Sequence, residues 1–201
     1  MKHSGLVMPE ADMLIHCGDF SRSGGMWELR TFNEWLGTLD YKHVLINAGN
    51  HDWNCFPPNV DDAKKAFTNA TLLIDESITI EGLRFYFSPW TREYKTWAYM
   101  KSKKELETFW EQTLPKNVDV LVTHEAPFGV LDIAQSAFGS MHLGCESLVK
   151  WVVENKPRYN FFGHIHGGYG RFKTPSTEFV NASISQEYPN QDLNQPVVIE
   201  I

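Results

Sequence analysis

Four short apolar segments, each ending abruptly in polar residues, constrain the fold of this chain more than any other feature. Residues 12–17, 43–48, 118–123 and 159–162 each have the composition of a short buried strand. They are followed by Gly18-Asp19, Gly49-Asn50-His51-Asp52, His124-Glu125 and Gly163-His164-Ile165-His166. In open α/β sheets, ligands bind beyond the carboxyl ends of the strands. The four polar strand ends are therefore predicted to converge on one crevice.

Helical patterns separate these strands. Apolar residues recur at three- and four-residue intervals over 26–39, 106–114 and 145–155. The order strand, helix, strand predicts largely parallel pairing with crossover helices. A hairpin is expected over 77–88, with its turn at Glu81-Gly82, and further strands are expected over 178–183 and 197–201. These features together predict an α/β fold with two β-sheets and helices on their outer faces.

Length and composition limit the classes of protein and partner. With 201 residues, of which 42% are hydrophobic, the chain is long enough for one sizeable core, so a single domain over 1–201 is expected. The net charge of −7 and the scattered basic residues argue against long nucleic acid as a partner. No segment approaches the ~20 apolar residues of a membrane span, and the three cysteines lack paired spacing. We therefore expect a cytoplasmic protein that acts on a small substrate away from membranes.

The polar strand ends offer the ligands of a metal site. Aspartate, asparagine and histidine are oxygen and nitrogen ligands that suit Mn, Fe or Zn. The adjacent glycines let the backbone turn sharply and bring these side chains close together. Each signal alone is weak, because an isolated His-x-His is more often a surface turn and a Gly-Asp after a strand is usually only a turn. Four such ends in one chain favour a metal centre.

The motifs GDF, GNHD, THEAP and GHIH, in this order, resemble those of the calcineurin-like metallophosphoesterase superfamily. The resemblance covers nearly the whole chain, because FNEWLGTL, GLRFYFSPW, HLGC and FVNAS are similar to the branch of small metallophosphoesterase-domain proteins from animal brain and from bacteria. It implies a four-layer fold in which two mixed β-sheets lie between helices. It also implies a hydrolase that uses two divalent metal ions to cleave a phosphoester.

The resemblance implies a metal-binding role for five residues of these motifs. Asp19 would bridge the two metal ions. Asn50, His124 and His164 would complete the coordination of one ion, and His166 would bind the other. Two cations ~3.5–4 Å apart hold a bridging hydroxide at neutral pH and contact both the attacking and the leaving oxygens. The two imidazoles of GHIH would thus serve different metals.

His51 would act as the general acid that protonates the leaving oxygen, a role that matters most for poor leaving groups. A phosphodiester such as a cyclic nucleotide is the expected substrate, because the sequence offers no obvious Arg/Lys pair to hold a dianionic monoester. Two alternatives stay open. One is a phosphomonoesterase, and the other is a catalytically impaired binding protein that retains one metal.

The resemblance is incomplete at the N-terminus. Superfamily members carry Asp-x-His at the end of a first strand, where it supplies two ligands to the metal that His166 would also bind. The first ten residues here contain no Asp, and His3 is a poor substitute because Pro9 interrupts the segment after it. We therefore expect that the first strand is missing, that one metal is weakly bound, and that the natural protein carries an N-terminal extension ending in Asp-x-His. A natural short form with a damaged site is the alternative.

Overall fold

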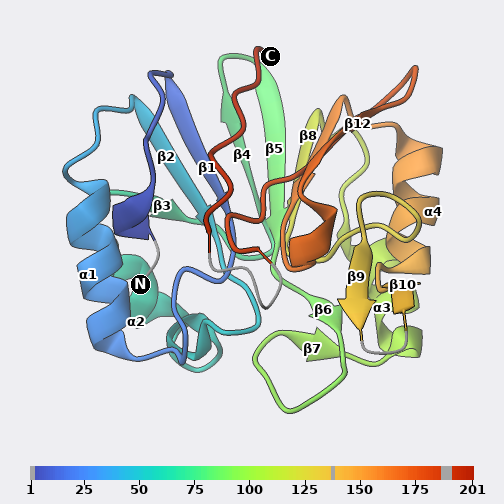
Figure 1. Ribbon diagram of the computed structural model, residues 1–201, viewed down its shortest axis with the longest axis horizontal. Helices are drawn as coiled ribbons and strands as arrows, with labels where there is room; N and C mark the ends of the chain where they lie inside the picture. Colours follow the sequence, from blue (N-terminus) through green and yellow to red (C-terminus); the bar gives the residue numbers. More distant parts are fainter. Residues whose placement is uncertain (1–2, 137–138, 187–191) are drawn as a thin grey trace.

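The computed structural model describes residues 3–136, 139–186 and 192–201. Its elements form four layers, in which two β-sheets lie side by side between an outer pair of helices on each side (Figure 1). This arrangement confirms the predicted layering. In the described part of the chain, no helix has the length and apolar character that crossing a bilayer would require.

The first sheet contains three strands in the order β1-β2-β3. They are β1 (Met13–Cys17), β2 (His43–Asn47) and β3 (Thr71–Leu72), all parallel to their neighbours. The helices α1 (Met26–Leu36) and α2 (Val60–Ala66) cover its outer face. Strand β1 therefore stands at the edge of the sheet, next to β2.

The second sheet contains six strands in the order β12-β13-β11-β8-β5-β4. The four inner strands are parallel, and the two edge strands are antiparallel to their neighbours. The helices α3 (Lys103–Thr113) and α4 (Glu146–Asn155) cover its outer face. The strands are β4 (Glu76–Ile80), β5 (Leu83–Ser88), β8 (Val120–Thr123), β11 (Tyr159–Phe162), β12 (Gly170–Lys173) and β13 (Glu178–Asn181).

Short elements lie near the ends of the strands. The pair β6 (Thr91–Arg92) and β7 (Met100–Lys101) and the hairpin β9 (Ile133–Ser136) and β10 (Gly139–His142) lie below the sheets in Figure 1. The described residues also form three 3-10 turns: η1 (His3–Gly5), η2 (Trp53–Cys55) and η3 (His166–Gly168).

Three apolar clusters fill the spaces between the four layers. Successive side chains of a strand point to opposite faces, so neighbouring residues enter different clusters. Ile46 packs under α1 and α2, whereas Leu45 faces the second sheet. Likewise Leu121 packs under α3 and α4, whereas Val122 faces the first sheet. The continuous apolar runs of β2 and β8 are explained by this burial on both faces.

Most strands that the sequence predicts are present within one or two residues. The apolar runs ending at Cys17, Ala48, Thr123 and Phe162 form β1, β2, β8 and β11, and the predicted hairpin forms β4 and β5. The predicted strand over 197–201 is wrong. Its carbonyls are held by side chains instead, as the Tyr159 hydroxyl donates to Glu200 O at 3.2 Å. A strand forms only where another backbone pairs with it, and none of the described strands does so there.

Candidate metal centre

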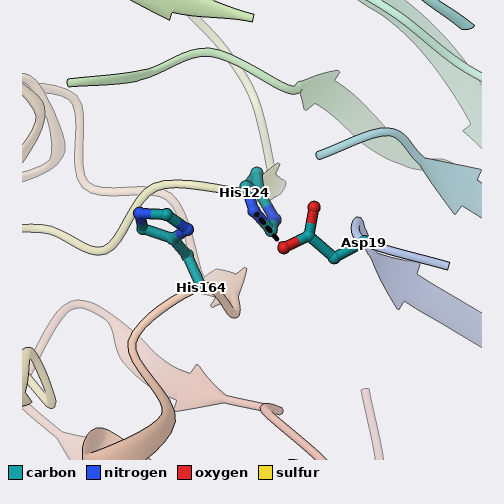
Figure 2. Close-up of side chains that lie close together, drawn as sticks. All are labelled: Asp19, His124 and His164. Atoms are coloured by element: carbon teal, nitrogen blue, oxygen red, sulfur yellow. Dashed lines mark ion pairs between the residues drawn. The ribbon is translucent and has the colours of Figure 1, made fainter. Parts of the chain in front are cut away.

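Side chains from four strand ends meet at one point. Asp19 follows β1, Asn50 follows β2, His124 follows β8 and His164 follows β11. Nε2 of His124 lies 3.2 Å from Oδ2 of Asp19 and 3.1 Å from Oδ1 of Asn50. The ligand atoms of Asp19, His124 and His164 all lie within 4.8 Å of one another, and Figure 2 shows the three side chains turned toward a shared centre.

Unusual backbone geometry brings these side chains together. Asp19 and His164 both adopt left-handed conformations, with φ of 61° and 65°. Such conformations are uncommon for residues other than glycine, and strained ones tend to cluster at functional sites. Gly18 has φ of 102°, and a Cβ there would lie 2.5 Å from both Ala48 O and His124 Nδ1. The glycine therefore lets β1 and β8 approach closely enough for Asp19 to reach His124.

The orientation of His124 presents one nitrogen to the cluster. Its Nδ1 lies 2.8 Å from the carbonyl oxygen of Cys17. A carbonyl only accepts hydrogen bonds, so Nδ1 carries the proton and donates it. In the neutral imidazole, Nε2 then holds the lone pair and points at Asp19 and Asn50. Protein-bound metals are commonly ligated by histidines whose other ring nitrogen is fixed in this way.

The electrostatics of the cluster favour a cation at its centre. Burial opposes charge on His124, but the Asp19 carboxylate outweighs it and raises the pKa of His124 to about 9. Burial likewise opposes charge on Asp19, but His124 holds the pKa of that carboxyl well below its usual range. Burial and the nearby His124 charge lower the pKa of His164 to about 3, which keeps its imidazole neutral and able to ligate.

The residues present fit one divalent cation. Two oxygens lie within 3.2 Å of His124 Nε2, an arrangement that requires positive charge between them, supplied by a proton or by a metal ion. A carboxylate oxygen, an amide oxygen and two imidazole nitrogens are suitable ligands for Mn, Fe or Zn. The ligand set that the sequence predicted for one ion, Asp19, Asn50, His124 and His164, is thus assembled in the structure.

His166 is placed differently. It begins η3, its side chain is exposed, and it does not belong to the three-residue group found among the described residues. It lines the groove into which the cluster opens. The structure therefore brings four of the five predicted ligands to one point and leaves His166 at the edge of the site.

Asp52, which was not predicted as a site residue, holds the backbone of the cluster through hydrogen bonds. It is fully buried, and its carboxylate accepts hydrogen bonds from the backbone N–H groups of Asp19, Gly49 and Ser21 at 2.8, 2.8 and 2.9 Å. Burial and the charge of Asp19 raise the pKa of Asp52 to about 7. Asp52 therefore fixes both the Asp19 backbone and the GNHD turn. The sequence signal for this role was the position of Asp52 in a tight turn, where backbone N–H groups need a hydrogen-bond acceptor.

His51 lies beside the cluster without joining it. Its backbone N–H donates to Asp19 Oδ1 at 2.9 Å, and its Nδ1 lies 2.8 Å from the carbonyl oxygen of Arg22. Because that carbonyl only accepts, Nδ1 is the donor and Nε2 is the ring nitrogen available for proton transfer. The ring of Trp97 lies 4.2 Å from the imidazole, centroid to centroid.

A groove of about 700 Å³ gives access to these side chains. It is lined by Asp19, His51, His124 and His164 at one end. From there it continues along β1 and the segment 196–199, where apolar side chains predominate. The cluster is therefore open to a small molecule.

Comparisons with known proteins give a consistent result. The family model described as Calcineurin-like phosphoesterase matches residues 3–168. Human Metallophosphoesterase domain-containing protein 1 is 34% identical over 220 residues, covering 98% of this chain and 66% of the human protein. A UPF0046 protein of Caenorhabditis elegans is 32% identical over 209 residues, covering 98% of this chain and 70% of its own.

A solved structure shares the fold at much lower sequence similarity. The crystal structure of TT1561 from Thermus thermophilus superimposes with a TM-score of 0.56 at 10% identity, over 86% of this chain and 77% of that one. The chain thus spans slightly less than two thirds of the length of the human relative, and most of the length of TT1561.

Proposed function

Because the chain belongs to the calcineurin-like phosphoesterase family, whose members are metal-dependent phosphoester hydrolases, we propose that its metal centre hydrolyses phosphodiesters. The observation that carries this proposal is the convergence of Asp19, Asn50 and His124 within 3.2 Å, with His164 beside them. Cyclic nucleotides are one class of diester that would suit a groove of this size. The active form is proposed to reside in the cytoplasm, which suits three buried cysteines that form no disulfide.

We propose two divalent ions of Mn, Fe or Zn as the cofactor. Asp19, Asn50, His124 and His164 would hold the first. Asp19 and His166 would contribute to the second, which two protein ligands hold only weakly. Divalent cations bound in such a site activate water and neutralise charge on the phosphoryl oxygens.

The residues of the chain then have distinct tasks. Cys17 O fixes the His124 tautomer, and Asp52 fixes the backbone of Asp19. Arg22 O fixes the His51 ring, leaving Nε2 to donate a proton to the leaving oxygen. General-acid catalysis of this kind contributes about 10²–10⁴-fold when the leaving group needs a proton.

A diester fits the charge of the groove better than a monoester. Of the described residues that line the groove, Arg22 is the one lysine or arginine. A dianionic monoester would gain from a second cationic side chain, whereas a diester carries a single charge. A phosphomonoesterase is therefore the less favoured alternative.

The test compares Asp19→Ala with Asp62→Ala, which removes an exposed carboxylate on α2 that lies outside the cluster. Hydrolysis of bis-nitrophenyl phosphate with manganese should be abolished by the first change and unaffected by the second. Bound metal, measured by mass spectrometry, should fall in parallel. Full metal content and full hydrolysis in Asp19→Ala would refute the assignment, and metal binding without hydrolysis in the unaltered chain would favour the impaired binding protein.

A second comparison isolates His51. His51→Ala should retain bound metal but lose more activity toward an alkyl ester, whose leaving group needs a proton, than toward a nitrophenyl ester. His43→Ala, at the start of β2, is the matched control. It should change neither the amount of bound metal nor the relative activity toward the two esters. Equal losses on both esters together with loss of metal would mean that His51 is a ligand or a structural residue.

A further inference from the structure

Residues 93–99 form a loop, here called the aromatic loop, whose two ends are fixed to each other. The flanking strands β6 and β7 pair in parallel, with Thr91 opposite Met100. Thr91 N donates to Tyr99 O at 2.8 Å, and Glu93 N donates to Lys101 O at 2.9 Å. The two ends of the loop therefore lie next to each other, and both are held by backbone hydrogen bonds.

The aromatic loop is also attached directly to the site. Ala98 N donates to the carbonyl oxygen of Asn50 at 3.1 Å, and both Ala98 and Tyr99 are buried. The hydroxyl of Tyr99 donates to Cys55 O. The part of the loop next to Asn50 and His51 thus has a defined position relative to them.

Two aromatic side chains of this loop lie next to histidines of the site. Trp97 lies 4.2 Å from the His51 ring, and Tyr94 lies 6.2 Å from the His164 ring. Tyr94 is 56% exposed, although large aromatic side chains are usually buried. Tyr99 and Trp90, by comparison, pack into the apolar core with other rings. Tyr94 and Trp97 thus lie beside two histidines of the site, outside the three apolar clusters.

His51 defines the direction in which the leaving group departs. As the proposed proton donor, it faces the oxygen of the departing alcohol, and Trp97 is the ring immediately beside it. Tyr94 lies near the same centre, beside the ring of His164. An aromatic substituent on that alcohol can therefore contact both rings in the offset or edge-to-face geometries that aromatic pairs prefer.

We propose that the aromatic loop selects phosphoesters whose alcohol carries a planar aromatic group, with Tyr94 as the contacting residue and Trp97 as the residue that positions His51. This inference rests on the proposed function for the location of the phosphate. It adds the chemical class of the organic group that the site prefers.

The probes are phenyl phosphate and cyclohexyl phosphate, which match in charge and nearly in size but differ in aromaticity. Binding to the full chain in the presence of manganese is measured by calorimetry, so that the readout does not depend on turnover. Phenyl phosphate should bind about fivefold more tightly, the range expected of an aromatic contact beyond simple apolar burial. Equal affinities would overturn the proposal.

Variants assign the preference to the loop. Tyr94→Ala, at an exposed position, should reduce the preference for phenyl phosphate to near unity, and Tyr94→Phe should restore it. Phe172→Ala, which removes another half-exposed ring on β12, is the matched control and should leave the preference unchanged. A preference that survives in Tyr94→Ala would also overturn the proposal.

Trp97 is tested through kinetics. Trp97→Phe keeps a ring beside His51 and should keep kcat, whereas Trp97→Leu should lower kcat on alkyl esters more than it raises KM. A change in KM alone would show that Trp97 only binds substrate and does not position His51. A preference for phenyl phosphate in a chain that hydrolyses no diester would leave this inference standing and refute the proposed function, so the two fail separately.

Discussion

At the scale of single residues, the centre of the site is held by opposite charges. Asp19 and His124 sustain each other's charged forms, since burial alone would neutralise both. In the metal-free chain the proton on His124 Nε2 occupies the side of the ring that faces Asp19 and Asn50. A metal ion at the same point must therefore displace that proton.

Metal binding should release a proton and strengthen as pH rises. The pKa of His124 is about 9 in the metal-free fold, so the ring is protonated at neutral pH and competes with the cation. Affinity for manganese should increase by about tenfold per pH unit from neutrality up to about pH 9 and then level off. Calorimetry in two buffers of different ionisation enthalpy measures the protons released. An affinity that does not change over this range would contradict the charged state of His124.

The same pKa fixes the sign of a stability change in the metal-free chain. A histidine whose folded pKa lies above its unfolded value of about 6.5 stabilises the fold below that value. This contribution is lost as pH rises through about 9. The free energy of unfolding of the metal-free chain, from urea denaturation, should therefore decline between pH 6.5 and 9. The decline should be smaller in His124→Asn, and an equal decline in both chains would assign it to other groups.

Asp52 offers a prediction that separates stability from metal binding. Asp52→Asn places an amide N–H₂ group against backbone donors, so the chain should lose at least about 2 kcal/mol of stability and bind manganese more weakly. Asp75→Asn is the matched control, because Asp75 is also an acidic acceptor, bonded to Ser88 and Trp90 away from the cluster. It should lower stability without changing metal affinity. Unchanged metal affinity in Asp52→Asn would show that Asp52 is structural only.

At the scale of elements, close approach between strand ends depends on glycine. Gly18→Ala adds a Cβ 2.5 Å from Ala48 O at a φ of 102°, so it should cost about 3 kcal/mol or more and separate Asp19 from His124. Gly82→Ala is the matched control, since Gly82 also has positive φ but has open space around it. It should cost only about 1–2 kcal/mol and leave metal affinity unchanged. Thermal unfolding and metal titration of both variants provide the measurement, and equal costs would mean that crowding at Gly18 is unimportant.

The sequence predicts those elements whose signal is local. The apolar runs of β2 and β8 and the glycine turn between β4 and β5 are visible along the chain, and so are Asp19, Asn50, His124 and His164 at strand ends. The seven-residue helix α2 and the hairpin β9–β10 were not predicted, because each is short and gains stability from the surfaces it contacts. The placement of Tyr94 beside His164 and of Trp97 beside His51 was not predicted, since it depends on a loop that folds back to Asn50.

At the scale of the whole molecule, the edge of the first sheet at β1 borders an open groove. All four residues of β8 are buried, whereas four of the five residues of β1 remain partly exposed. Among the described strands β1 pairs only with β2, and its other side borders the groove of about 700 Å³. Val197 and Ile199 line that groove, in the segment where the predicted strand is not formed. The groove is thus bordered by the edge of β1 that faces away from β2 and by a segment with strand-forming sequence.

One more strand in this groove should stabilise the fold and complete the proposed second metal site. The test is to add, ahead of Met1, an alternating apolar segment that ends in Asp-x-His. Paired with β1, it should bury several apolar side chains at about 1.5–3 kcal/mol each, offset by the cost of ordering the segment. A net gain should raise the melting temperature by about 2–4 °C per kcal/mol and allow 197–201 to pair as a strand. Its terminal carboxylate and imidazole would supply two further ligands to the second ion proposed at His166.

The matched control carries the same segment ending in Ala-x-Ala. Both extended chains should melt above the 201-residue chain, because strand pairing does not depend on the last residues. Only the Asp-x-His chain should bind a second equivalent of manganese and hydrolyse bis-nitrophenyl phosphate faster. If neither segment raises the melting temperature, the groove does not accept a strand. If both raise it but neither adds a metal, the strand belongs to the fold and His166 is not part of a second metal site.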